Sequence, residues 1–205
     1  MKGLLVVDIQ NDFLPGGALG VPDGDKIIST VNKLQYHNEF KLVVGTQDWH
    51  PPDHGSFASN HEGKNPLDII ELGGLEQILW PDHCVQGSIG SDFPKELDIN
   101  KMEAIFRKGM EKEIDTYSAF FDNGHKKDTG LTGYLRARNI DHVYIVGLAG
   151  DFCVNFSIRD ALEQNFKVTL IEDCTRPINT DEFENVLKEL KEKGTEIISS
   201  GDLLT

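Results

Sequence analysis

The sequence has few cysteines, no long hydrophobic run and too few basic residues to balance the acidic ones. Its 205 residues include 20 lysines and arginines against 34 aspartates and glutamates, so the formal net charge is −14. Because nucleic-acid phosphates and anionic membrane surfaces are also negative, this charge argues against both as partners. The apolar runs, such as residues 4–7 and 143–148, are too short to cross a bilayer. No signal-peptide cleavage site follows the N-terminus, so no secretion signal is expected.

The cysteines are Cys84, Cys153 and Cys174. An odd number does not suit a disulfide framework, so we expect a reducing compartment, the cytoplasm. Hydrophobic residues make up 39% of the chain and charged residues 26%, which is ordinary for a soluble globular protein. The length favours one domain with a sizeable core, and we predict that it spans residues 1–205.

Short apolar runs alternate with segments whose apolar residues recur at helical spacing. Strands are predicted at residues 4–7, 41–44, 104–106, 143–146, 168–171 and 196–198. Helices are predicted at residues 25–37, 131–138, 152–164 and 180–193, with a further short helix at 67–79. Continuously apolar strands that alternate with helices indicate a parallel sheet covered on both faces. We therefore predict an α/β fold, a three-layer α/β/α sandwich around a mostly parallel sheet of about six strands.

Two of these helices carry more detailed expectations. In the helix at 152–164, the spacing predicts that Phe156, Ile158 and Leu162 face inward. Thr180 is the expected N-cap of the last helix, because its hydroxyl can accept from the first free amides. Cys174 is expected to follow a strand with no helix start behind it.

Four chemically capable residues stand where predicted strands end or where a helix follows one. They are Asp8, Asp48, Lys108 and Cys153. In parallel sheets ligands bind beyond the carboxyl ends of the strands, so this coincidence indicates a site there. Residues 49–100 carry little periodic structure and are rich in Pro, Gly, Asp and His. A connection of this length within a compact domain is usually functional.

Four of the seven histidines fall between residues 50 and 83. Asp48 and His50 are two positions apart, so on an extended chain both side chains point the same way. Imidazole and carboxylate together suit a borderline divalent metal such as zinc, and also iron or manganese. A structural zinc site is the alternative, but it prefers four protein ligands, often with cysteine.

Cys153 lies in Gly-Leu-Ala-Gly-Asp-Phe-Cys-Val, at a strand-to-helix turn. Free amides and the helix dipole lower a thiol pKa at such a turn and favour an oxyanion nearby. The alternative is a small buried hydrophobe, which free cysteine usually is. Beside a thiol, the ammonium of Lys108 would stabilise a thiolate and Asp8 would serve as general base. By itself, Lys108 is equally well a solvated lysine and Asp8 a turn residue.

Three separated motifs occur together in this sequence. The first, from residue 7, reads Val-Asp-Ile-Gln-Asn-Asp-Phe, and the second, from residue 46, reads Thr-Gln-Asp-Trp-His-Pro-Pro-Asp-His-Gly-Ser-Phe. The third, from residue 80, reads Trp-Pro-Asp-His-Cys-Val-Gln-Gly-Ser and continues to Arg-Lys-Gly at 107 and Asp-Thr-Tyr-Ser-Ala-Phe at 115. Their combination resembles the isochorismatase-like cysteine hydrolase superfamily, and within it the nicotinamidases. The resemblance covers residues 5 to about 175.

The resemblance implies a role for each matching position. Asp8, Lys108 and Cys153 match the catalytic triad, and Asp48, His50 and His83 match the ligands of one divalent metal, with zinc the first choice. His54 lies near a further histidine that some members use in the metal shell. Phe13, Trp80 and Tyr117 match the aromatic walls around the pyridine ring. The backbone amides of Ala149 and Cys153 match the oxyanion hole, with a cis peptide between Leu148 and Ala149. One departure is Gly150, where a threonine often stands.

The implied activity is hydrolysis of nicotinamide, and of pyrazinamide, through a cysteine thioester, with the metal anchoring the pyridine nitrogen. This reaction is a step in NAD salvage. Many relatives self-associate, so the resemblance is compatible with a homo-oligomer, but no apolar stripe in the sequence indicates a number of subunits. Amidases for carbamoyl or ureido substrates share the triad but lack the metal motifs, and isochorismatases proper also lack the cysteine. A non-catalytic metal-sensing or interaction protein with the same fold is the alternative outside the enzymes.

Overall fold

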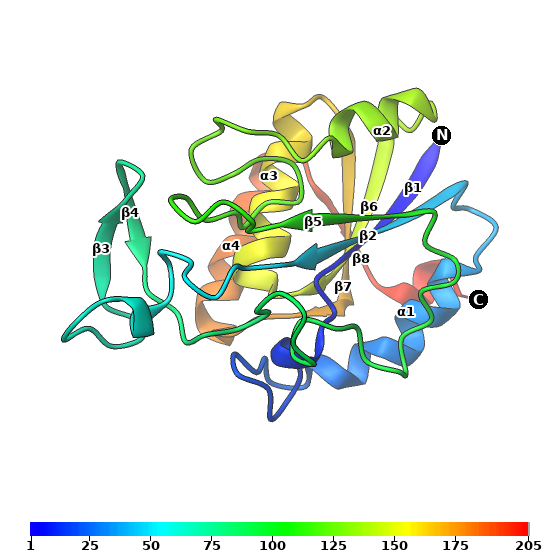
Figure 1. The fold of residues 1–205 in the computed structure, drawn as a ribbon. Helices are drawn as coiled ribbons and strands as arrows, with labels where there is room; N and C mark the ends of the chain where they lie inside the picture. Colours follow the sequence, from blue (N-terminus) through cyan, green and yellow to red (C-terminus); the bar gives the residue numbers. More distant parts are fainter. Residues whose placement is uncertain (205) are drawn as a thin grey trace.

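A six-stranded sheet forms the centre of the computed structural model, which describes residues 1–204 (Figure 1). Every pair of neighbouring strands is parallel. In spatial order the strands are β5 (Ala104–Lys108), β2 (Leu42–Asp48), β1 (Lys2–Val7), β6 (His142–Leu148), β7 (Lys167–Arg176) and β8 (Glu196–Ile198). The predicted parallel sheet of about six strands is therefore confirmed.

Helices cover both faces of this sheet and complete the predicted three layers (Figure 1). On one face, Leu4 and Val6 of β1 pack with α1 (Ile28–Gln35). On the other face, Leu5 and Val7 pack in a second core cluster with the remaining helices. These are α2 (Leu131–Ala137), α3 (Asn155–Glu163) and α4 (Thr180–Glu192). Because successive side chains of a strand point to opposite faces, a continuously apolar strand serves both clusters. Among residues 1–204, no helix is both long enough and apolar enough to cross a membrane.

The prediction of a short helix at residues 67–79 is wrong. This segment is an antiparallel hairpin of β3 (Ile69–Leu72) and β4 (Leu75–Ile78), which stands away from the central sheet (Figure 1). Gly73 and Gly74 form its turn with φ angles of +62° and +86°. Two residues with positive φ make the tight turn that matches the twist of a hairpin, and Gly-Gly is a sequence signal for it. The turn chemistry outweighs the apparent helical spacing.

Three finer expectations are also wrong. Asn179, not Thr180, caps α4, because its side-chain oxygen accepts from the amides of Asp181 and Glu182. Phe156 is 38% exposed rather than inward, whereas Ile158 is fully buried as predicted. Cys174 lies inside β7, which runs well beyond residue 171.

The two acidic residues that follow the predicted strand at 168–171 lie in an irregularity of β7. Its pairing with β6 shifts between Ile145 and Gly147, so that Ile145 pairs with Leu170 but Gly147 pairs with Thr175. The strand therefore continues past its exposed acidic pair, Glu172 and Asp173. These two charged side chains indicate that this part of β7 is exposed to solvent. They do not indicate that the strand ends there.

Gly147 allows β6 to approach β1 closely at the carboxyl end of the sheet. Its φ is +125°, and a Cβ at this position would lie 2.1 Å from the carbonyl oxygen of Val7. No other residue type fits without moving one of the two strands. The close approach brings the turn after β6 next to the residue that follows β1, Asp8.

Candidate active site

The carboxyl ends of the central strands bring the four predicted strand-end residues together. Asp8 follows β1, and Cys153 follows β6 in a π-helical turn, Gly150–Val154. Asp48 and Lys108 are the last residues of β2 and β5, and they are direct partners in the sheet register. Parallel strands end at the same edge, so residues that are distant in sequence meet there.

Lys108 lies at the centre of this group. Its Nζ is 2.9 Å from Asp8 Oδ2, donates to Asp48 Oδ1 at 2.8 Å, and lies 3.5 Å from Cys153 Sγ. A further hydrogen bond to the carbonyl oxygen of Thr116 measures 2.9 Å. All four ionisable side chains are buried. One ammonium group therefore balances two carboxylates and contacts the thiol.

Burial and the neighbouring charges set the protonation states. Burial raises the pKa of the Cys153 thiol well above its ordinary value, and the opposing effect of Lys108 does not cancel it. Burial also raises the pKa of Asp8. For Lys108 burial acts the other way, but Asp48 and Asp8 prevail and hold its pKa well above the ordinary range. A protonated thiol thus lies near a carboxylate that accepts protons more readily than usual.

The turn that carries Cys153 also contains the expected backbone features. The peptide bond between Leu148 and Ala149 is cis, as the resemblance implies. A Cβ at Gly150 would lie 2.8 Å from the ring of Phe183 in α4. The Phe183 ring therefore fills the space that a side chain at position 150 would need. This packing explains why glycine stands here, where a threonine is frequent in the superfamily.

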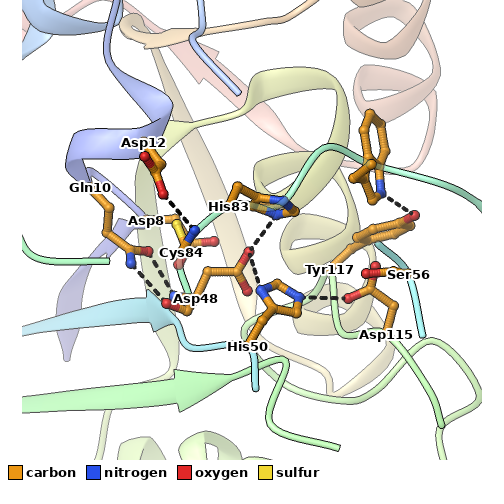
Figure 2. A network of polar contacts seen from close by, with 12 residues as sticks. Asp8, Gln10, Asp12, Asp48, His50, Ser56, His83, Cys84, Asp115 and Tyr117 are labelled. Atoms are coloured by element: carbon orange, nitrogen blue, oxygen red, sulfur yellow. Dashed lines mark hydrogen bonds and ion pairs between the residues drawn. The ribbon is translucent and has the colours of Figure 1, made fainter. Parts of the chain in front are cut away.

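Asp48, His50 and His83 form a buried cluster whose ligand atoms all lie within 4.8 Å of one another. Asp48 Oδ2 is 3.8 Å from His50 Nδ1 and 3.6 Å from His83 Nε2 (Figure 2). Two ligands of a tetrahedral zinc ion are separated by about 3.4 Å, since each lies about 2.1 Å from the metal. The spacing therefore fits a divalent ion.

The hydrogen bonds of the two imidazoles leave one nitrogen of each for a metal. His83 Nδ1 lies 2.8 Å from the carbonyl oxygen of Pro81, so it carries the proton and Nε2 is free. His50 Nε2 lies 3.2 Å from Asp115 Oδ1 (Figure 2). His50 Nδ1 is buried without a hydrogen-bond partner. A histidine that binds metal usually donates its other N–H to a carboxylate or carbonyl, and both side chains match this pattern.

His54 belongs to a different cluster, with His50 and Asp115. Its Nδ1 lies 2.7 Å from the hydroxyl of Ser56, while Nε2 is buried without a partner. The ring meets that of His50 edge-on, with 4.4 Å between centroids. Burial lowers the pKa of His54 to about 4, so it is neutral at pH 7. His54 thus lies with Asp115 near the Nε2 side of His50. It does not belong to the group that Asp48 and His83 form with His50 Nδ1.

Two polar side chains of the first motif contact the segments that carry the histidine–carboxylate cluster. Gln10 donates to the carbonyl oxygen of Asp48 at 2.8 Å and accepts from its amide at 2.7 Å. Asp12 accepts from the amide of Cys84 at 2.7 Å, next to His83 (Figure 2). Neither residue was given a role from the sequence, although both stand in a motif that carried the resemblance.

A pocket lies between Cys153 and the histidine–carboxylate cluster, since Cys153, Asp48 and His83 all line it. Its walls are mostly apolar and include the three aromatic residues expected from the resemblance, together with others that the sequence did not single out. The lining residues are Phe13, Leu19, Asp48, Trp80, His83, Asp115, Tyr117, Ala149, Phe152, Cys153 and Ile178.

Asp115 and Phe152 are the main omissions of the sequence reasoning. Asp115 supports His50, and this contact lowers the pKa of Asp115 to about 2 despite its burial. Phe152 packs edge-on against Trp80, with 5.0 Å between ring centroids. Both residues stand beside recognised positions, in Asp-Thr-Tyr and Phe-Cys, and that adjacency was the only available signal.

Comparison with known proteins gives consistent matches over nearly the whole chain. A model of the isochorismatase domain matches residues 2–202. The chain is 46% identical to a nicotinamidase from Escherichia coli (strain K12) over 180 residues, which cover 87% of this chain and 84% of that relative.

Solved structures show the same similarity in three dimensions. A nicotinamidase and pyrazinamidase from Acinetobacter baumanii superposes with a TM-score of 0.94 at 48% identity, covering 99% of this chain and 98% of that one. The yeast nicotinamidase bound to the inhibitor nicotinaldehyde gives 0.93 at 36% identity, with coverages of 97% and 100%. The pyrazinamidase of Pyrococcus horikoshii in complex with zinc gives 0.78 at 37% identity, with coverages of 97% and 98%.

Proposed function

The chain belongs to the isochorismatase family, and we propose that this amidohydrolase converts nicotinamide and water to nicotinate and ammonia. One observation carries the proposal: a small aromatic-walled pocket has a buried Asp8–Lys108–Cys153 group on one side and a histidine–carboxylate cluster on the other. The nicotinamidases among its relatives make nicotinamide the first substrate to test. Pyrazinamide, which has a similar planar ring and carboxamide, is expected to react as well.

The residues of the metal cluster fit a divalent ion. Asp48, His50 and His83 would hold it, because each presents a free donor atom to the same space. When bound, the ion would supply a Lewis-acidic position that anchors the pyridine nitrogen. Zinc is the first candidate, and iron or manganese would also suit this donor set. His54 would help to orient the ring of His50 and would not bind the ion itself, because it is grouped with Asp115 and His50 and not with Asp48 and His83.

The remaining chemistry belongs to the side chains of this protein. Asp8 takes the proton of the Cys153 thiol, and Sγ attacks the carboxamide carbon. Lys108 stabilises the thiolate, since its ammonium lies 3.5 Å from Sγ. The backbone amides of Ala149 and Cys153 hold the oxyanion, where losing one donor typically costs about 3 kcal/mol of barrier.

Breakdown of this tetrahedral adduct reverses the role of Asp8. The C–N bond breaks as protonated Asp8 gives its proton to the leaving amide, which departs as ammonia and leaves a thioester on Cys153. Asp8 then takes a proton from water, whose oxygen attacks the thioester carbon. The C–S bond breaks, nicotinic acid leaves, and the proton on Asp8 returns to the thiolate.

The aromatic residues would orient the ring for this attack. We propose that Phe13, Trp80 and Tyr117 wall the pyridine, with Phe152 as a further contact at the nucleophile turn. The three cysteines are free, which agrees with the proposed cytoplasmic place of the enzyme in NAD salvage.

The test is ammonia release from nicotinamide by the zinc-loaded protein. Cys153→Ala is expected to abolish release, because Cys153 is the one thiol among the residues that line the pocket and its Sγ lies 3.5 Å from the Lys108 ammonium. Cys174→Ala is the matched control, since this buried cysteine lies in β7 outside the pocket lining. Turnover by Cys153→Ala at the rate of the control would contradict the nucleophile assignment. Absence of ammonia release by the unmodified protein from both nicotinamide and pyrazinamide would contradict the proposed substrate.

A further inference from the structure

The β3–β4 hairpin carries one buried amide. Along β4 the side chains of Leu75, Glu76 and Ile78 are exposed or half-buried, whereas Gln77 is only 3% exposed. A buried polar group is costly unless it is hydrogen-bonded, so its partners indicate its purpose.

The partners of Gln77 belong to the candidate active site. Its Nε2, which carries two hydrogens, lies within hydrogen-bond distance of three acceptors, so at least one N–H is shared: the carbonyl oxygen of Ile78 at 2.7 Å, the hydroxyl oxygen of Tyr117 at 3.0 Å and Asp115 Oδ2 at 3.1 Å. Trp80 Nε1 donates to the same Tyr117 oxygen at 3.1 Å. A single amide therefore joins the carboxylate behind His50 to two aromatic walls of the pocket.

Two contacts keep the hairpin against the loop that carries Asp115 and Tyr117. Lys126 donates to the carbonyl oxygen of Gly73 at the hairpin turn, at 2.9 Å. A Cβ at Gly73 would lie only 2.5 Å from the carbonyl oxygen of Glu113, so the two segments are in close contact. The hairpin stands away from the central sheet (Figure 1), but it rests on the loop that completes the pocket.

We propose that Gln77 is a positioning residue that sets the Tyr117 hydroxyl and the Asp115 carboxylate at the same time. The hydroxyl oxygen of a tyrosine has two lone pairs, and Gln77 and Trp80 occupy both. These two bonds fix the Tyr117 hydroxyl relative to Trp80, and both residues line the pocket. Asp115, held on its other oxygen, keeps His50 oriented toward Asp48 and His83.

The inference rests on the proposed function only where it concerns substrate. Gln77 does not line the pocket and has no hydrogen bond to the triad.

Gln77→Met removes both donors and keeps the length of the side chain. It is expected to raise the KM for nicotinamide about tenfold, because residues that orient metal ligands and pocket walls usually act on this scale. The kcat should stay within about twofold, since the Asp8–Lys108–Cys153 contacts are unchanged.

A second measurement needs neither substrate nor metal. In a Trp49→Phe background Trp80 is the remaining tryptophan, and its 4% exposure predicts weak fluorescence quenching by acrylamide. Gln77→Met should increase the quenching constant about threefold, because Tyr117 loses one of the bonds that hold it against Trp80. Glu76→Gln, on the exposed side of the same strand, is the control and should change neither quenching nor KM.

Quenching and KM for Gln77→Met equal to those of Glu76→Gln would overturn the proposal. An increase in quenching without any hydrolysis by the parent protein would support the positioning role while refuting the proposed substrate. If Gln77→Met does not fold, Gln77→Leu also removes the donors and has a smaller apolar side chain. This second variant should show the same increase in quenching, and control-like values for it would overturn the inference equally.

Discussion

Replacing Lys108 with methionine should destabilise the metal-free protein strongly. The methionine side chain keeps most of the length of the lysine stem but removes the ammonium that lies within 3 Å of both Asp8 and Asp48. All three side chains are at most 5% exposed, so water cannot take over the role of the cation. In the variant both carboxylates stay buried, Asp8 loses its charged partner, and Asp48 keeps only the neighbouring imidazoles of His50 and His83.

The size of the effect follows from this burial. Removing one partner of a buried ion pair costs about 3–5 kcal/mol. For a chain of this length each kcal/mol lowers the melting temperature by about 2–4 °C, so the expected loss is on the order of 10 °C. Lys112→Met is the matched control, because Lys112 lies 3.0 Å from Asp53 but both side chains are more than half exposed. Thermal unfolding at pH 7.5 should show no measurable change for this control.

The pH dependence gives an independent check on the cause. Burial already raises the pKa of Asp8, and without the ammonium the folded-state pKa of this carboxyl rises further above the unfolded value of about 3.9. The folded variant then binds protons more readily than the unfolded chain, so its deficit should shrink as the pH falls from 7 toward 4. A melting temperature within about 2 °C of the parent at pH 7.5 would refute this reasoning. A deficit that does not change with pH would also refute it.

Three further results are expected. Zinc at about 100 times its dissociation constant should stabilise the metal-free protein by about 2.7 kcal/mol, and His83→Ala should remove this gain in thermal unfolding. Asp115→Asn should weaken zinc binding about 10- to 100-fold in a competition titration, because His50 loses the carboxylate that orients it; unchanged affinity would contradict that role. Burial lowers the pKa of His54 to about 4, so the unfolded chain takes up a proton below pH 6.5 that the folded chain does not. His54 therefore contributes stability that is present above pH 6.5 and declines by about 3 kcal/mol as the pH falls to 4. His54→Gln should lose less stability over this range, and an identical decline in denaturant titrations would exclude His54 as the cause.

The central sheet and the residues at its strand ends were predictable because two simple rules apply to them. Buried parallel strands are continuously apolar, and their carboxyl ends meet at one edge. These rules bring Asp8, Asp48, Lys108 and Cys153 together before any coordinates are known. The distances among them were not predictable, since they depend on the register that pairs Asp48 with Lys108.

The supporting residues were beyond the reach of sequence reasoning. Gln77 lies in a segment misread as helix, and a glutamine there looks like any surface residue. Asp115 stands in a recognised motif, but its importance depends on which nitrogen of His50 faces it. Such roles come from contacts between segments that are far apart along the chain, and local composition does not encode them.

The two hydrogen bonds between the Gln10 side chain and the backbone of Asp48 have a structural consequence for the sheet. Neighbouring strands normally run on together so that their peptide groups stay paired, which leaves no room between them. Here β1 ends at Val7 and turns away, with Asp8 at a φ of +46°, while β2 continues to Asp48. The primary amide of Gln10 imitates a peptide unit of the departed strand. The sheet can therefore divide at the carboxyl ends of its strands, and the backbone of Asp48 stays hydrogen-bonded at the position that presents the carboxylate of the histidine–carboxylate cluster.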